Sequence, residues 1–236
     1  MWSMVLFSLY LLFPDYSLSE EAPLTLTLFY ESYCSDCIQF IENQLAVAWQ
    51  LFKGNMRFDL VPFGKALRSD SIDPEGKYSC QHGPKECLGN KLHACAIWQV
   101  CGESGTKDCP PDQMNHLINY ILCVEKTKNQ LDATPQCAIV EGFDSPAIIH
   151  CATSHQGAEL NDYYGHRTRN FTHNRMIDFV PTVVFDGVKD AAAAYDLVSE
   201  ICRARPALCM ADPVQTYFKR KKTETSDYFG PFMIMY

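Results

Sequence analysis

The chain has 236 residues, of which 47% are hydrophobic and 20% are charged, with a formal net charge of -8 and twelve cysteines. Its apolar fraction excludes a disordered chain, and its acidic balance argues against nucleic acid as a partner, because phosphate binding rests on clustered Lys and Arg. Twelve cysteines are typical of a protein made for an oxidising compartment, and the length is that of one large domain or two small ones.

The N-terminus has the pattern of a secretory signal peptide. Residues 4–13 form an uncharged run rich in Leu, Phe and Val, and the small-x-small triplet Ser17-Leu18-Ser19 follows. We expect cleavage after Ser19. A membrane anchor is the alternative, but this apolar run is far shorter than the roughly 20 residues that span a bilayer. No later segment is long enough either, so we expect no membrane span in the mature chain.

A β-α-β unit should open the mature chain. Residues 24–30 first alternate apolar and polar residues and then become wholly apolar, which predicts a strand that enters a core. Apolar residues recur at helical spacing over 38–52, and Gly54 closes that helix as a C-cap. The short apolar run 57–61, ended by Pro62, predicts a second strand parallel to the first.

A long cysteine-rich segment follows. Residues 64–174 carry eight of the twelve cysteines and favour short helices and loops. The better helical stretches are 88–100 and 114–124, with Pro110-Pro111 as the breaker between them. We therefore expect this segment to be a mainly helical insertion.

The chain then returns to the small sheet. Residues 179–187 predict a β-branched strand that ends in an Asp-Gly turn, and residues 191–203 predict a closing helix. These elements and the β-α-β unit belong to one sheet, so the predicted fold class is α/β. We expect no fold for residues 210–236, whose basic run 219–222 is typical of a solvated or disordered segment, or of a propeptide that is removed.

The candidate active site is Cys34-Ser35-Asp36-Cys37, where the first strand meets the first helix. Backbone N–H groups and the dipole at a helix N-terminus stabilise a thiolate, so Cys34 is the predicted nucleophile. Cys37, one turn later, can resolve a mixed disulfide. A zinc site would need a second closely spaced Cys or His pair, which the sequence lacks, and a disulfide closing so small a loop adds little stability. Dithiol exchange without a metal is the favoured interpretation.

Two further sites are expected. In a thioredoxin-type sheet a cis-proline opens the strand opposite the C-x-x-C and offers backbone groups to substrate, so we expect Val180 and Pro181 to bind substrate and their peptide bond to be cis. An ordinary trans proline at a strand start is the alternative. Asn170-Phe171-Thr172 is the sole N-x-[ST] sequon and predicts a glycan on a loop, with an unused surface tripeptide as the alternative.

Residues 80–95 read C-Q-H-G-P-K-E-C-L-G-N-K-L-H-A-C. This stretch resembles the C-Q-H-G-x-x-E-C-x-x-N-x-x-x-x-C signature of the gamma-interferon-inducible lysosomal thiol reductase family, and the resemblance covers about residues 24–209. Further matching residues are Tyr30-Glu31-Ser32, Cys151, Gly157, Leu160, Val180-Pro181-Thr182-Val183-Val184, Cys202 and Cys209. The resemblance implies a thioredoxin-like reductase of lysosomes or the extracellular space that reduces protein disulfides at acid pH without a bound cofactor. It also implies that Cys34 and Cys37 are the active pair.

Other signature residues are expected to be structural. Nothing in the spacing places His82 near Cys34, and Glu86 and Asn90 lie one turn apart on a predicted helix. The ten cysteines outside the C-x-x-C predict up to five disulfides, whose pairing cannot be read from the sequence. The inner dipeptide Ser35-Asp36 departs from relatives that often have proline or glycine at its first position, and this interior tunes the redox potential.

Together these features predict a thiol:disulfide oxidoreductase of the secretory pathway. We expect a signal peptide over 1–19, a thioredoxin-like domain over 20–209 and a tail over 210–236. Substrates would be disulfide-containing proteins, and a small-molecule thiol would be the electron donor. Two alternatives stay open: an oxidase or isomerase with the same chemistry, and a secreted disulfide-rich binding protein on a thioredoxin-like scaffold.

Overall fold

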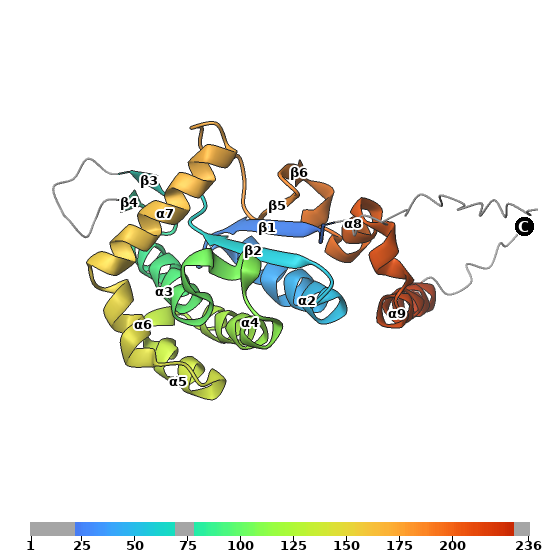
Figure 1. Cartoon of the computed structure of the whole chain (residues 1–236), viewed down its shortest axis with the longest axis horizontal. Helices are drawn as coiled ribbons and strands as arrows, with labels where there is room; N and C mark the ends of the chain where they lie inside the picture. Colours follow the sequence, from blue (N-terminus) through green and yellow to red (C-terminus); the bar gives the residue numbers. More distant parts are fainter. Residues whose placement is uncertain (1–21, 69–77, 229–236) are drawn as a thin grey trace, which may run out of the picture.

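A four-stranded sheet with the order β2-β1-β5-β6 forms the centre of the fold in a computed structural model that describes residues 22–68 and 78–228 (Figure 1). The central strand β1 runs parallel to β2 and antiparallel to β5, which forms a hairpin with β6. The sheet thus joins the two ends of the domain, as predicted. The predicted signal peptide lies outside the described residues. The strands are β1 (Thr25–Tyr30), β2 (Arg57–Pro62), β5 (Thr182–Phe185) and β6 (Val188–Asp190).

One continuous helical rod follows β1. It consists of α1 (Ser35–Phe40), a π-helical turn η1 (Ile41–Leu45) and α2 (Ala46–Phe52). The rod therefore begins three residues before the predicted start, because its polar first turn carries no apolar periodicity. Gly54 follows with a φ of 83°, the left-handed conformation predicted for a residue that ends a helix.

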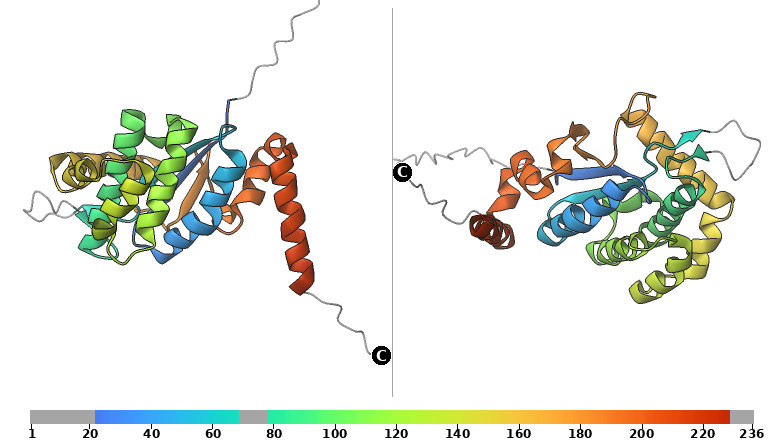
Figure 2. Two further views of the ribbon diagram at one scale, coloured as in Figure 1. Left: turned by 90° about the horizontal axis from the view of Figure 1, so that it is seen from below. Right: turned by 180° about the vertical axis from the view of Figure 1, so that it is seen from behind.

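The segment between β2 and β5 is mainly helical. Figures 1 and 2 show α3 and α4 on the same side of the sheet as α2, with α5 and α6 beyond them. Both α3 and α4 begin at a proline, which suits the first position of a helix because that residue's N–H would have no partner there. The elements are β3 (Leu67–Arg68), β4 (Tyr78–Ser79), α3 (Pro84–Cys101), η2 (Gly102–Asp108), α4 (Pro111–Glu125), α5 (Gln130–Glu141), α6 (Ser145–Ala152) and α7 (His155–Phe171).

The ten cysteines outside the C-x-x-C form five disulfides. Two of them join separate helices: Cys95–Cys151 connects α3 to α6, and Cys123–Cys137 connects α4 to α5. The others close short loops and are Cys80–Cys87, Cys101–Cys109 and Cys202–Cys209.

The end of the chain differs from the prediction. The closing helix α8 (Leu197–Ala204) starts later than expected, because Asp196 caps it by accepting a bond from Ser199 N–H at 3.4 Å, and a 3-10 turn η3 (Ala192–Ala194) precedes it. The Asp186-Gly187 turn before β6 is present as predicted.

The expectation of no fold for residues 210–236 is wrong for 212–228, and residues 229–236 lie outside the described part of the chain. After the 3-10 turn η4 (Pro206–Met210), residues Asp212–Tyr228 form α9, which lies at the edge of the molecule (Figure 2). Val214 is fully buried, and Lys221 forms a 2.8 Å ion pair with Asp196. The basic run is thus the charged side of a packed helix. Removal of the tail stays a prediction. No helix in the described part of the chain is long and apolar enough to cross a membrane.

Candidate active site

The two cysteines of the C-x-x-C lie at the start of the helical rod, and both are free thiols. Cys34 is the N-cap of α1, with an extended backbone, and Cys37 lies in the first turn. Cys34 is 7% exposed, whereas Cys37 is fully buried. Cys34 is therefore the more accessible of the two cysteines.

The pKa values of the two thiols are shifted in opposite directions. The pKa of Cys34 is lowered from 9.0 to about 6, first by a hydrogen bond from the Cys37 side chain and then by the backbone N–H groups of Cys37 and Asp36. Burial and the negative charge of Asp36 oppose this shift. The pKa of Cys37 is raised strongly, first by burial and then by its hydrogen bond to Cys34 and the charge there. The arrangement favours a thiolate on Cys34 and a thiol on Cys37.

Helix α3 holds the loop between β1 and Cys34 in place. Ser32 N–H donates to Asn90 Oδ1 at 2.9 Å, and Ser32 Oγ donates to the Glu86 carbonyl at 3.2 Å. Gly89 permits this approach, since a Cβ there would lie 2.4 Å from Ser32 Oγ. From α5, Gln130 Nε2 donates to the Ser32 carbonyl at 2.5 Å. The structural role expected for Asn90 and Glu86 is thus to position the active-site loop.

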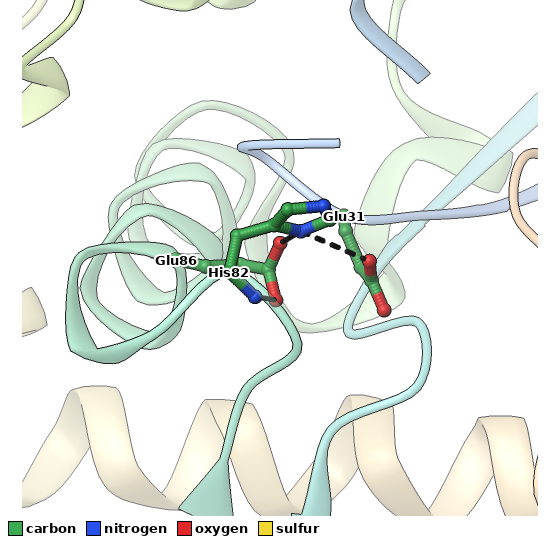
Figure 3. A group of neighbouring side chains, drawn as sticks. All are labelled: Glu31, His82 and Glu86. Atoms are coloured by element: carbon green, nitrogen blue, oxygen red, sulfur yellow. Dashed lines mark hydrogen bonds and ion pairs between the residues drawn. The ribbon is translucent and has the colours of Figure 1, made fainter. Parts of the chain in front are cut away.

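A cluster of Glu31, His82 and Glu86 lies beside this loop (Figure 3). His82 Nδ1 bonds the Glu86 carboxylate and lies 3.7 Å from Glu31 Oε2. Both carboxylates are fully buried. Glu31 is also tied to the two cysteines through its backbone, because its carbonyl accepts from Cys34 N–H at 3.4 Å and its N–H lies 3.5 Å from Cys37 Sγ.

The pKa values of Glu31 and His82 in this cluster are both raised. Burial raises the pKa of Glu31 to about 7, with further contributions from the charges of Glu86 and Cys34. Burial lowers the pKa of His82, but the bond and charge of Glu86 outweigh it and raise the pKa overall. The spacing of His82 in the sequence did not place it near Cys34, yet the fold brings the two within electrostatic reach.

The same three side chains could bind a metal ion, since their ligand atoms lie within 4.8 Å of one another. The hydrogen bond between His82 and Glu86 already occupies the imidazole Nδ1. We therefore regard the cluster as a proton-sharing network and assign no metal to it.

Sequence reasoning missed a further buried acid, Glu125. Glu125, the last residue of α4, is 4% exposed, and its two carboxylate oxygens have no hydrogen-bond partner in the described structure. Burial raises its pKa well above the ordinary value, and the charge of Cys34 adds to this. Glu125 in turn raises the pKa of Cys37. A lone Glu at a predicted helix end gives no sequence signal for such a position.

The Val180–Pro181 peptide bond is cis, and both residues are buried. The Val180 carbonyl oxygen lies 4.0 Å from Cys34 Sγ, so the fold brings these two predicted positions together. Asn170 lies elsewhere, exposed in the last turn of α7. The expectation that this sequon lies on a loop is therefore wrong, because α7 continues through Phe171.

Comparisons with known proteins agree with this geometry. Residues 25–140 match the family model for gamma interferon inducible lysosomal thiol reductase. The gamma-interferon-inducible lysosomal thiol reductase-like protein of Anopheles gambiae is 33% identical over 189 residues, 77% of this chain and 74% of that protein. GILT-like protein 1 of Drosophila melanogaster is 30% identical over 207 residues, 80% of each chain.

Among solved structures, DsbA of Chlamydia trachomatis is similar, with a TM-score of 0.51 at 16% identity over 81% of this chain and 89% of that one. The predicted fold class is confirmed: the fold is thioredoxin-like with a mainly helical, disulfide-rich insertion.

Proposed function

This chain belongs to the gamma-interferon-inducible lysosomal thiol reductase family and is a thiol oxidoreductase, and from that premise we propose that it reduces protein disulfides through Cys34 and Cys37. The observation that carries the proposal is the contrast between the two thiols. One is partly accessible with its pKa lowered to about 6, and the other is buried with its pKa raised. A nucleophile and a resolving thiol need these opposite properties.

The reaction is an exchange of two electrons between dithiol and disulfide. The Cys34 thiolate attacks one sulfur of the substrate disulfide, a mixed disulfide forms, and the other substrate sulfur leaves as a thiolate that takes up a proton. Cys37 then loses its proton and attacks Cys34 Sγ, which releases the second substrate thiol and leaves a Cys34–Cys37 disulfide. A small-molecule thiol, the electron donor that we propose, restores the dithiol.

Formation of the mixed disulfide prepares Cys37 for its step. In the free enzyme, the negative charge and hydrogen bond at Cys34 both raise the pKa of Cys37. Once Cys34 Sγ is bonded to substrate it carries no charge, so both contributions disappear, and burial and the charge of Glu125 are what still oppose ionisation of Cys37. The resolving thiol is therefore kept inactive until there is a mixed disulfide to resolve.

We propose that the protein acts at acid pH, in lysosomes or outside the cell. With a pKa of about 6 for Cys34, about a tenth of the molecules carry the thiolate at pH 5. An ordinary cysteine with a pKa of roughly 8.5 would have roughly 300-fold less. We also propose that Val180 and Pro181 bind the substrate backbone, which the 4.0 Å approach of the Val180 carbonyl to Cys34 Sγ supports.

The test is insulin turnover at pH 5 and pH 7.4 by the mature protein, with Cys34→Ser beside it. Ile139→Ala is the control, because Ile139 is 68% exposed and lies on α5, outside the C-x-x-C. We expect activity in the native protein and the control, and none in Cys34→Ser. If Cys34→Ser turned over insulin as fast as the native protein, the proposed mechanism would be wrong. If no form turned over insulin, a binding protein on this scaffold would be favoured.

A further inference from the structure

A groove of about 350 Å³ runs beside the C-x-x-C. Its volume is at the lower end of the range found for ligand sites in proteins. One wall comes from the helical rod, including Asp36 and Gln44, and the other includes Val180, Pro181 and Tyr195. Because Val180 lines the groove and its carbonyl oxygen is 4.0 Å from Cys34 Sγ, the groove lies next to the nucleophile.

Tyr195 lies in this groove with a fixed backbone and a free ring. Gln44 Nε2 donates to the Tyr195 carbonyl at 2.6 Å, and Gln44 Oε1 accepts from Leu197 N–H at 3.0 Å. One amide side chain thus clamps the backbone on both sides of Asp196. Tyr195 is nevertheless 84% exposed.

The clamp depends on an irregular turn of the rod. Gln44 belongs to the π-helical turn Ile41–Leu45, which also contributes Asn43 to the groove. Turns of this kind are rare inside α-helices and occur frequently at functional sites. Here the turn supplies the residue that fixes Tyr195. An exposed aromatic side chain on a rigid backbone binds a partner with little loss of conformational entropy, as binding hot spots do.

The charge of the groove selects among partners. Asp36 is exposed and is the charged residue among the groove's lining residues, which include no Lys or Arg. A segment with a basic side chain near Asp36 is therefore favoured over an acidic one. Successive side chains of an extended peptide point to opposite sides, so neighbouring residues of one segment can face Asp36 on one wall and Tyr195 on the other.

We propose that this groove is a subsite for an extended segment of the substrate polypeptide next to its disulfide-bonded cysteine. The Tyr195 ring contacts an apolar or aromatic side chain of that segment, and Asp36 faces a basic one. The inference rests on the proposed reductase function and adds what the protein recognises in its substrates.

The test compares two disulfides that differ in size. One is a disulfide-bridged peptide with Phe and Lys next to its cysteine, and the other is the small reagent 5,5'-dithiobis(2-nitrobenzoate), which has no peptide flank. For each variant we measure kcat/KM on both and take the ratio of peptide to reagent. We expect Tyr195→Ala to lower this ratio about tenfold, mainly through KM, and Tyr195→Phe to keep it. Replacing Lys by Glu in the peptide should lower the ratio in the native protein but less in Asp36→Asn.

Ile139→Ala is the matched control, because Ile139 is 68% exposed but does not line the groove. Its ratio should equal that of the native protein. If Tyr195→Ala also keeps the native ratio while the reagent is reduced normally, the groove proposal is wrong and the reductase function stands. If the native protein reduces neither disulfide, the proposed function is wrong and the subsite is overturned with it.

Discussion

The ionisation of Cys34 gives the sharpest prediction. The largest cause of its lowered pKa is the hydrogen bond from the Cys37 side chain, ahead of the backbone N–H groups of the helix start. Cys37→Ala removes that donor, whereas Cys37→Ser replaces it with a hydroxyl that can still donate. We therefore expect the pKa of Cys34, about 6 in the native protein, to rise in Cys37→Ala and to rise less in Cys37→Ser.

The kinetic effect is large enough to measure. At pH 5 a pKa of about 6 gives roughly 900 times more thiolate than a pKa of 9.0. The more acidic thiolate is also a weaker nucleophile, by roughly 20-fold for a Brønsted coefficient of about 0.45. A net advantage of about 40-fold in rate at pH 5 remains. Loss of the lowered pKa should reduce the alkylation rate of Cys34 by up to that factor.

The assay is the rate of iodoacetamide alkylation of Cys34 against pH, read by mass spectrometry of the Cys34 peptide. Circular dichroism of each variant controls for folding, since Cys37 is fully buried. The pH at which the alkylation rate is half-maximal should be lower in Asp36→Asn than in the native protein, because the charge of Asp36 raises the pKa of Cys34. A native midpoint near pH 8, or equal midpoints in the native protein and Cys37→Ala, would refute this explanation of the acid-active thiol.

Three other predictions concern Cys37, Asn170 and His93, a fully buried residue of α3 whose Nδ1 lies 3.2 Å from the Tyr30 hydroxyl. Cys37→Ser should accumulate covalent adducts through Cys34 with a denatured disulfide substrate, and gels without reductant that show none would contradict the assigned roles. Expression through a secretory pathway should add a glycan at Asn170, and a mass loss on deglycosylation that persists in Asn170→Gln would exclude that site. Burial lowers the pKa of His93 to about 3 against 6.5 in the unfolded chain, so its contribution to stability is present above pH 6.5 and is lost as the pH falls toward 3. Between pH 7.5 and pH 5 this removes about 2 kcal/mol from the free energy of unfolding. His93→Gln should reduce that loss in denaturant titrations, and an unchanged pH dependence would contradict it.

The sequence predicts the sheet better than it predicts the surroundings of the thiols. The strands β1 and β5 have period-two or wholly apolar sequence patterns, and such patterns indicate directly which residues of a strand are buried. The positions of the C-x-x-C and of Val180-Pro181 were also predictable, because each short motif lies at the end or the start of a strand that the sequence itself indicates. The disulfide pairing of the ten other cysteines could not be predicted, because many pairings are possible as long as the arrangement of the helices in space is unknown.

The environment of Cys34 depends on contacts between distant parts of the chain. His82 and Glu125 lie in or near helices of the insertion, and nothing local to them signals a neighbouring thiol. The pKa of Glu125 is raised by burial in the packed fold, whereas the pKa of His82 is raised by the bond and charge of Glu86 and by the charge of Glu31, which the fold brings beside it. The α9 helix was missed for a related reason, since its basic run gives no sign of the buried Val214 and the partly buried Tyr217 and Phe218 that pack it against the domain.

The position of β1 at the centre of the sheet has a consequence for biosynthesis. Phe29 of β1 pairs with Thr182 of β5. About 150 more residues must therefore be translated after β1 before β5 can pair with it, which takes roughly 8–30 s at 5–20 residues per second. Cys34 and Cys37 are thus synthesised ahead of every other cysteine and before Val180, whose carbonyl lies 4.0 Å from Cys34 Sγ in the folded protein. Closing so short a loop costs far less entropy than joining either thiol to a cysteine of the insertion. A Cys34–Cys37 disulfide formed at this stage, with its two electrons passed to an external disulfide, keeps these two sulfurs out of the later pairings.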